Sequence, residues 1–122
     1  MLTDTHAHIC SDEFDADREA VLARAYRAGI RSIVAVGEDR ADAEKTIALA
    51  RQFPILKPAA GLYPTHLDTA AADKMTAFIR ANRQVLSAIG EVGLDFWVVK
   101  TEEERIVQRE IFARFITLSV AL

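Results

Sequence analysis

The sequence contains little cysteine, proline or glycine: one Cys, three Pro and five Gly among 122 residues. The single cysteine, Cys10, has no partner for an internal disulfide, which is typical of proteins from a reducing compartment. No basic and apolar leader precedes Leu2, and the longest apolar runs are well short of the roughly 20 residues that a membrane span requires. We therefore expect a cytoplasmic protein with no membrane-spanning segment.

An excess of positive charge is also lacking, since the formal net charge is -3 at pH 7. Phosphate affinity grows with the number of Lys and Arg contacts, so the composition argues against tight nucleic-acid binding through a broad basic surface. It does not argue against a nuclease in which bound metal ions, and not a basic surface, bind the phosphate. With 51% hydrophobic and 27% charged residues, and no linker or low-complexity tract, the chain is expected to form one globular unit over residues 1–122.

Two histidines lie one residue apart in the stretch L-T-D-T-H-A-H, which runs from Leu2 to His8. Side chains alternate between the two faces of an extended strand, so His6 and His8 point the same way, and Asp4 lies on their face. Taken alone, this pattern is equally typical of hydrogen-bonded polar residues at a strand end and of a pair of metal ligands.

Hydrophobic periodicity predicts four strands, each followed by a helix. Short apolar or β-branched runs mark the strands, and apolar residues spaced by three and four mark the helices. Gly29 ends the first helix, and Thr101 with Glu104 forms the capping-box pattern of the last. The expected strands cover residues 2–8, 31–36, 55–60 and 84–89, and the expected helices run from about 14 to 28, 41 to 52, 69 to 82 and 101 to 122.

This alternation predicts an α/β fold of four parallel βα units joined by right-handed crossovers. In such folds the loops that follow the strands carry the chemistry. The polar candidates lie at or just after the ends of the predicted strands: His6 and His8 end the first, and the later strands are followed by Glu38 and Asp39, Tyr63 and His66, and Glu91 and Asp95. Their shared position favours a metal site, because histidines and carboxylates together make common ligand sets.

Four parallel units would leave two open sheet edges and an uncovered inner face. The last predicted helix also ends on the apolar stretch L-S-V-A-L, without a glycine or a basic last turn. We expect either that the sequence is the first half of a longer barrel or that two copies close against each other as a homo-oligomer.

Several stretches together resemble the TatD family of metal-dependent deoxyribonucleases, within the amidohydrolase-like TIM barrels. They are D-T-H-A-H in the first strand, D-E-F-D-A-D-R-E-A-V after it, G-L-Y-P-T-H, I-G-E-V-G-L-D-F and Q-R-E-I-F. The resemblance covers essentially the whole chain. H-x-H followed by G-E-x-G-L-D in this order is specific, whereas either motif alone would be weak.

The resemblance implies that the chain is the first half of a TIM (β/α)8 barrel of roughly twice this length. It also implies two divalent metal ions, zinc, manganese or magnesium, with the histidine pair on one ion and a glutamate bridging both. By motif position these ligands are His6, His8 and Glu91. Two later histidines and a late aspartate of the family lie beyond this chain, so a single ion is the expectation if the chain is truncated. The chain also has Tyr63 where the family often carries histidine, and Phe115 where it often carries glutamine.

The other candidate residues keep two interpretations each. Asp4 either binds a metal ion directly or, as we expect, orients a histidine. Asp95 either holds the loop as a turn-stabilising carboxylate after Gly93 or contacts substrate. His66 either touches a substrate phosphate or lies exposed in its loop. Cys10 is a soft zinc ligand or, as we expect, a small buried thiol.

Phe96 and Trp97 also have two interpretations. They could stack on a nucleic-acid base, because aromatic rings are sequence-tolerant platforms for single strands. More often such residues pack a loop against a barrel rim.

Our prediction is a divalent-metal-dependent hydrolase of TatD type that cleaves DNA phosphodiester bonds, acting on single strands or DNA ends, with Glu91 in the catalytic role. One alternative is a hydrolase of the same fold that acts on an amide or ester. The other is a truncated, non-catalytic half-barrel that only binds metal or self-associates.

Overall fold

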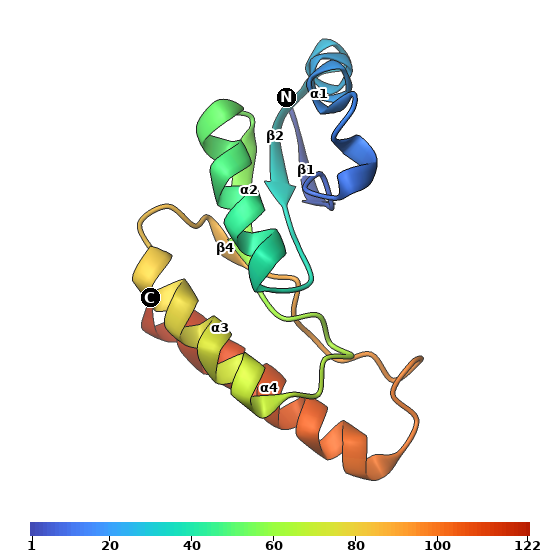
Figure 1. The fold of residues 1–122 in the computed structure, drawn as a ribbon, viewed down its shortest axis with the longest axis vertical. Helices are drawn as coiled ribbons and strands as arrows, with labels where there is room; N and C mark the ends of the chain where they lie inside the picture. Colours follow the sequence, from blue (N-terminus) through green and yellow to red (C-terminus); the bar gives the residue numbers. More distant parts are fainter.

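The computed structural model describes all 122 residues and contains four parallel strands in the order β1-β2-β3-β4 (Figure 1). Helices alternate with the strands, as the sequence predicts, so the four βα units are confirmed. The elements are β1 (Leu2–Ala7), the 3-10 turn η1 (Asp12–Phe14), α1 (Arg18–Arg27), β2 (Ile30–Ala35), α2 (Arg40–Gln52), β3 (Leu56–Ala60), α3 (Thr69–Asn82), β4 (Ala88–Ile89) and α4 (Glu102–Ala121).

Local hydrogen bonds fix where the helices begin. The carboxylate of Asp39 accepts from the backbone N–H of Asp42 at the start of α2, and that of Asp68 accepts from two N–H groups at the start of α3. Thr101 and Glu104 form the predicted capping box before α4. Gly29 follows α1 with a φ of 100°, a left-handed conformation that glycine adopts without steric cost.

Two predicted boundaries were wrong. The fourth strand was expected over residues 84–89, but β4 contains only Ala88 and Ile89, because the N–H groups of Val85 and Leu86 turn back to the Asn82 carbonyl at the end of α3. The first helix was expected from about residue 14, but α1 begins at Arg18, because η1 occupies the preceding residues. Both differences come from tight turns that replace the regular element.

Two apolar clusters cover the sheet. The smaller one packs α1 and α2 against β1, β2 and β3, and contains Ile9, Cys10, Leu22, Ile33, Ala35, Leu49 and Leu56. The larger one gathers α2, α3 and α4 around the end of β3, and contains Ala43, Ile47, Ala60, Leu62, Ala72, Met75, Phe78, Ile79, Ile111, Phe115 and Leu118. Phe115 is 1% exposed and belongs to this packing.

The long helices α3 and α4 lie side by side (Figure 1). Arg114 of α4 reinforces this contact, donating to the Thr69 carbonyl and the Asp73 carboxylate at the start of α3. None of the helices combines the length and the apolar composition that crossing a membrane would need.

Candidate metal centre

Three side chains from opposite ends of the sheet converge at the carboxyl ends of the strands. His6 belongs to β1, His8 follows it directly, and Glu91 follows β4. The Nε2 atoms of the two histidines are 3.2 Å apart, and Glu91 Oε2 lies 3.6 Å from His6 Nε2 and 3.2 Å from His8 Nε2. The predicted alternation of His6 and His8 onto one face is therefore what the structure shows.

The convergence requires a strongly curled sheet, because β1 and β4 are its two outer strands. Three strand spacings would place the backbones of the outer strands roughly 14 Å apart in a flat sheet, with the side chains pointing along parallel directions. Contact between His6 and Glu91 means instead that the sheet bends toward the face that carries them. This curvature is that of a half-barrel, with the ligand-bearing side chains on the inner side.

Backbone contacts hold Glu91 in place. The N–H of Gly90 donates to the Ala60 carbonyl at 2.9 Å, and the N–H of Glu91 donates to the Gly37 carbonyl at 3.4 Å. A Cβ atom on Gly61 would lie 2.5 Å from the Glu91 carbonyl oxygen and 2.7 Å from the Gly90 carbonyl carbon. Only glycine at position 61 therefore allows β3 and the loop after β4 to approach this closely.

The chemistry of the three groups fits a cation. Glu91 Oε2 is buried and accepts no hydrogen bond, although both imidazole nitrogens lie near it. Neutral imidazoles present nitrogen lone pairs and an ionised carboxylate presents oxygen lone pairs, so three electron donors face a common point. Such a cluster is stable when a proton or a metal ion lies between the groups, and all of its ligand atoms lie within 4.8 Å of one another.

Asp4 and Cys10 lie near the histidines without joining the cluster. Asp4 Oδ1 accepts from the backbone N–H of His6 at 3.0 Å, so it contacts the strand backbone and not an imidazole ring. Cys10 is buried, donates to the Val36 carbonyl at 3.4 Å, and its pKa is raised mainly by burial. The structure thus matches the expectation of a buried thiol at Cys10.

His66 and Asp95 also lie outside the cluster of ligand atoms. The His66 ring packs edge to face with Tyr63, with 6.2 Å between ring centroids. Asp95 Oδ1 accepts from the backbone N–H groups of Trp97 and Val98, each at 3.0 Å. His66 is exposed in its loop, and the Asp95 contacts are those of a turn-stabilising carboxylate, while a contact of either residue with substrate stays a prediction.

Two buried polar side chains anchor the loops beside the site, and sequence reasoning missed both. Arg18, at the start of α1, donates to the carbonyls of Ile9 at 2.8 Å and Ser11 at 3.0 Å. Gln108 of α4 is 1% exposed, donates to the Pro64 carbonyl at 2.8 Å and accepts from the Asp95 N–H at 3.1 Å. A signal existed for Gln108, since it lies three residues before the buried Ile111 and so falls on the inward stripe of its helix.

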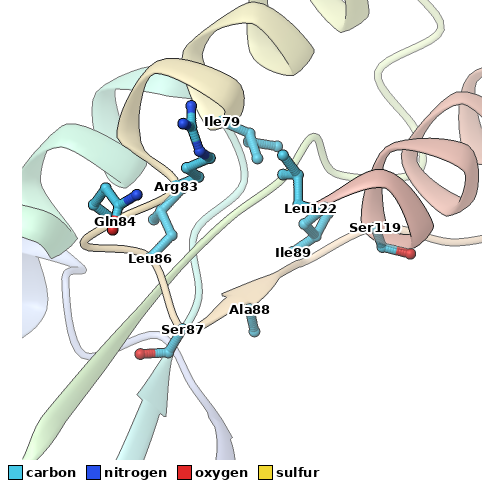
Figure 2. A pocket seen from close by; sticks show the side chains of 9 residues that line it. All are labelled: Ile79, Arg83, Gln84, Leu86, Ser87, Ala88, Ile89, Ser119 and Leu122. Atoms are coloured by element: carbon cyan, nitrogen blue, oxygen red, sulfur yellow. The ribbon is translucent and has the colours of Figure 1, made fainter.

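Two cavities differ in their relation to the cluster. One of about 330 Å³ adjoins His8 and is lined mostly by polar groups: Cys10, Ser11, Asp12, Glu13, Glu38 and Asp42. Another of about 460 Å³ lies between the end of α3, β4 and the end of α4 (Figure 2). The second cavity contains none of the three converging residues, whereas the polar cleft includes His8.

Comparisons with known proteins agree on one family. The family model described as TatD related DNase matches residues 3–122. The chain is 31% identical to the deoxyribonuclease TATDN3 of Homo sapiens, covering 99% of this chain and 48% of that protein. It is 32% identical to the 3'-5' ssDNA/RNA exonuclease TatD of Salmonella typhimurium, covering 88% of this chain and 43% of that protein.

A solved structure shows the same fold. The crystal structure of YjjV, a TatD homologue from Escherichia coli, superposes with a TM-score of 0.81 at 25% identity, covering 97% of this chain and 46% of that one. The four βα units therefore match the first half of a TIM barrel, as the sequence predicts. The chain spans about half the length of the curated relatives it matches.

Proposed function

Because this chain belongs to the family of TatD related DNases, we propose that residues 1–122 form a partial barrel domain. The domain supplies metal ligands to a divalent-metal-dependent hydrolase that cleaves DNA phosphodiester bonds. The observation that carries the proposal is the convergence of His6, His8 and Glu91. The names of the relatives, which include deoxyribonucleases and an ssDNA/RNA exonuclease, support nucleic acid as the substrate. We also infer a cytoplasmic location, supported by the single buried thiol.

In this proposal His6 and His8 bind one ion through their Nε2 atoms, and Glu91 binds it through Oε2. The second carboxylate oxygen of Glu91 gives it the capacity to bridge to another ion, so two ions are proposed for a complete barrel and one for this half alone. Zinc, manganese and magnesium all accept such ligands. When bound, such an ion polarises a phosphoryl oxygen and lowers the pKa of a bound water.

The chain's own residues then contribute three effects. The curled sheet holds the two imidazoles and the carboxylate in contact before any substrate arrives, so little rearrangement accompanies binding. The negative charge of Glu91 compensates part of the charge of a divalent cation. The half-exposed rings of His6 and His8 leave an open side toward solvent, where a phosphodiester can approach.

Metal binding by the purified full chain tests the ligand assignment. We expect stoichiometric binding of Zn²⁺ or Mn²⁺ in isothermal titration calorimetry, and a loss of affinity of at least roughly 10-fold in His6→Ala, His8→Ala and Glu91→Gln. His66→Ala is the matched control, because His66 is a loop histidine outside the cluster. Equal binding by all four variants would overturn the assignment.

Cleavage assays separate the proposed reaction from its alternatives. A labelled single-stranded oligonucleotide should be shortened in the presence of Mn²⁺ and not after chelation with EDTA, whereas an aminoacyl ester should remain intact. Ester hydrolysis without nucleic-acid cleavage would favour another hydrolase specificity on the same fold. Metal binding without any hydrolysis would favour a non-catalytic half-barrel.

The non-catalytic alternative has one structural observation in its favour. The outer face of α4 carries apolar side chains that are exposed, among them Ile106, Ile116 and Val120. An apolar face of this kind is typical of a surface that packs against another element. Native mass of the chain at several concentrations would show whether a second copy covers it.

A further inference from the structure

The loop between β4 and α4 presents large aromatic side chains to solvent. We call residues 94–100 the aromatic loop. Trp97 is 84% exposed and Phe96 is 40% exposed, and Leu94 and Val98 are exposed beside them. A tryptophan left this open buries little apolar surface in the folded loop, since most of its surface stays in water.

The backbone of the aromatic loop is nevertheless tightly held. The carboxylate of Asp95 accepts from the N–H groups of Trp97 and Val98, and the N–H of Val99 donates to the Asp95 carbonyl. Arg105 of α4 donates from Nε to the Val99 carbonyl at 3.0 Å and from Nη2 to the Phe96 carbonyl at 3.3 Å. The indole of Trp97 is thus displayed on a fixed backbone, so binding to it costs little ordering of the loop.

Cations lie against both aromatic rings. Lys100 Nζ is 4.7 Å from the centroid of Trp97, and the Arg105 guanidinium is 4.6 Å from that of Phe96. Aromatic faces next to cations are the combination that binds a base by stacking and its phosphate by charge. The cations are conspicuous because the chain as a whole has a net charge of -3.

Three acidic residues follow the loop, of which Glu102 and Glu104 have partners and Glu103 is exposed without one. Glu102 pairs with Arg109, and Glu104 accepts from Thr101 in the capping box. The Asp95 carboxylate faces the loop backbone through its two accepted hydrogen bonds. Their negative charge is therefore partly compensated before any phosphate approaches the aromatic loop.

The aromatic loop is linked to the candidate metal centre through the chain and through α4. Glu91 and Trp97 belong to the same segment between β4 and α4, and Gln108 joins Asp95 to Pro64 in the loop after β3. Both loops follow the carboxyl ends of parallel strands, the edge at which His6 and His8 also lie. The aromatic loop and the three converging residues therefore share the carboxyl-terminal edge of the sheet.

We propose that Trp97, flanked by Phe96 and assisted by Lys100, stacks on an unpaired base of a single-stranded nucleic acid. This inference rests on the proposed nuclease function and deepens it by naming where the unpaired strand is held. Stacking on an indole needs an accessible base face, which a single strand offers and the interior of a duplex does not. The aromatic loop therefore selects single strands without selecting sequence.

The single tryptophan of the chain makes the proposal directly measurable. Intrinsic fluorescence of the full chain is titrated with a 12-nucleotide oligo(dT) in EDTA and low salt, so that binding is observed without cleavage. We expect saturable quenching of Trp97 emission by the single strand and much weaker quenching by the corresponding duplex. Unchanged emission, or equal quenching by the duplex, would overturn the proposal.

Substitutions identify which side chain contributes to nucleic-acid affinity. The affinity of each variant is measured by fluorescence anisotropy of a 5'-labelled oligo(dT). Trp97→Ala should weaken binding by roughly 5- to 100-fold, whereas Trp97→Phe should retain most of the affinity because it keeps an aromatic face. Lys100→Met should reduce the dependence of log K on log[salt] by roughly 0.7, the value for one phosphate contact with a single strand. Unaltered circular dichroism would confirm folding, as expected for side chains this exposed.

The design also separates this inference from the proposed function. Oligonucleotide cleavage in Mn²⁺ without any response of Trp97 would remove the stacking site and leave the nuclease function intact. Quenching of Trp97 by single strands in a chain that binds no metal would keep the stacking site and remove the support for the nuclease function. A shift of Trp97 emission with protein concentration alone would show that a second copy covers the aromatic loop, and would overturn the assignment to nucleic acid.

Discussion

The histidine side and the carboxylate side of the candidate metal centre are each supported by one buried polar side chain, but the two supports differ in reach. Arg18 ties down carbonyls only seven and nine residues before it, in the loop that directly follows β1. Gln108 connects a carbonyl 44 residues away, in the loop after β3, with an N–H in the loop after β4. One support is local, whereas the other joins two loops.

The positions of the histidines and of Glu91 are fixed in different ways. His6 and His8 take their directions from the alternation of side chains along β1, which pairs with β2 on both sides of a register shift between Asp4 and Ala7, so their placement follows from a short stretch of sequence. Glu91 follows a strand of only two residues and depends on close packing against Gly61 and on a backbone hydrogen bond to Gly37. The carboxylate side is therefore the part that distant substitutions should disturb most.

The largest effect is expected from Gly61→Ala, which acts on the carboxylate side alone. The new Cβ would lie 2.5 Å from the Glu91 carbonyl oxygen, a backbone atom that cannot rotate away. We expect a loss of roughly 2–3 kcal/mol in the free energy of unfolding and a loss of roughly 10-fold or more in metal affinity. Urea denaturation of the metal-free chain and calorimetric titration with Zn²⁺ measure the two effects separately.

Gly90→Ala provides a matched control for that substitution. It adds the same methyl group next to Glu91, but the nearest atom to the new Cβ is Val36 Cγ1 at 3.9 Å, an ordinary contact distance. Gly61→Ala should therefore be the more damaging of the two. Equal effects of the two substitutions on metal affinity would contradict the role assigned to the close approach at Gly61.

The second-largest loss of stability is expected from Gln108→Met. This substitution removes the link between two loops while keeping a side chain of similar size. The Pro64 carbonyl and the Asp95 N–H each lose their partner, for an expected destabilisation of about 2 kcal/mol. Amide hydrogen exchange should become faster in both loops, residues 61–68 and 90–101. Faster exchange confined to one of them would mean that Gln108 does not connect the two.

Arg18→Met should have a smaller effect and a more local one. The variant deprives the Ile9 and Ser11 carbonyls of a donor and removes the ion pair with the half-exposed Asp15, so we expect a loss of about 1–2 kcal/mol. Hydrogen exchange should change in residues 8–17 and stay unaltered in the loops that Gln108 joins. Accelerated exchange near Asp95 would remove the distinction between the two supports.

The smallest effect is a pH dependence of stability that arises from Asp15, in the loop held by Arg18. Hydrogen bonds from Arg18 and then Lys45 lower the pKa of Asp15 from its ordinary value of 3.8. Because the folded-state pKa is the lower one, this contribution is present above about pH 4 and is lost as the pH falls toward the folded-state value. Lys45 also binds Asp12, whose carboxylate faces the same ammonium group.

Asp15→Asn tests this pH dependence. The difference in urea midpoint between wild type and variant should be largest at pH 6 and should shrink as the pH is lowered to 3. Gln108 carries no charge, so the corresponding difference for Gln108→Met should not follow the same titration. A difference for Asp15→Asn that stays constant over this range would show that its ionisation does not support the loop.

Much of this architecture follows from local sequence patterns. The four βα units, the helix caps at Thr101 and Glu104 and the shared direction of His6 and His8 were all predictable, because each depends on residues a few positions apart. The strand-end rule also indicated that Glu91 belongs on the histidines' edge of the sheet. Its assignment as a metal ligand stays a prediction until binding is measured.

The remainder depends on contacts between distant segments. β4 is short because a turn at the end of α3 takes the residues that would otherwise extend the strand. The apolar run Val85–Ile89 alone does not show where that turn ends and the strand begins. The buried position of Gln108 depends on two loops that only meet in the folded chain. The close approach between Gly61 and the Glu91 backbone likewise forms only when the end of β3 packs against the loop after β4.

The contact between the two outer strands has a further consequence for folding. An ion shared by His6, His8 and Glu91 would act as a cross-link between the first and the fourth strand, enclosing most of the chain in one loop. The conformational entropy removed from the unfolded state grows only slowly with the length of such a loop, so even a long closure is thermodynamically accessible. Metal binding would then add to the stability of the folded chain, and the apo chain would open most easily where His6 and His8 meet Glu91.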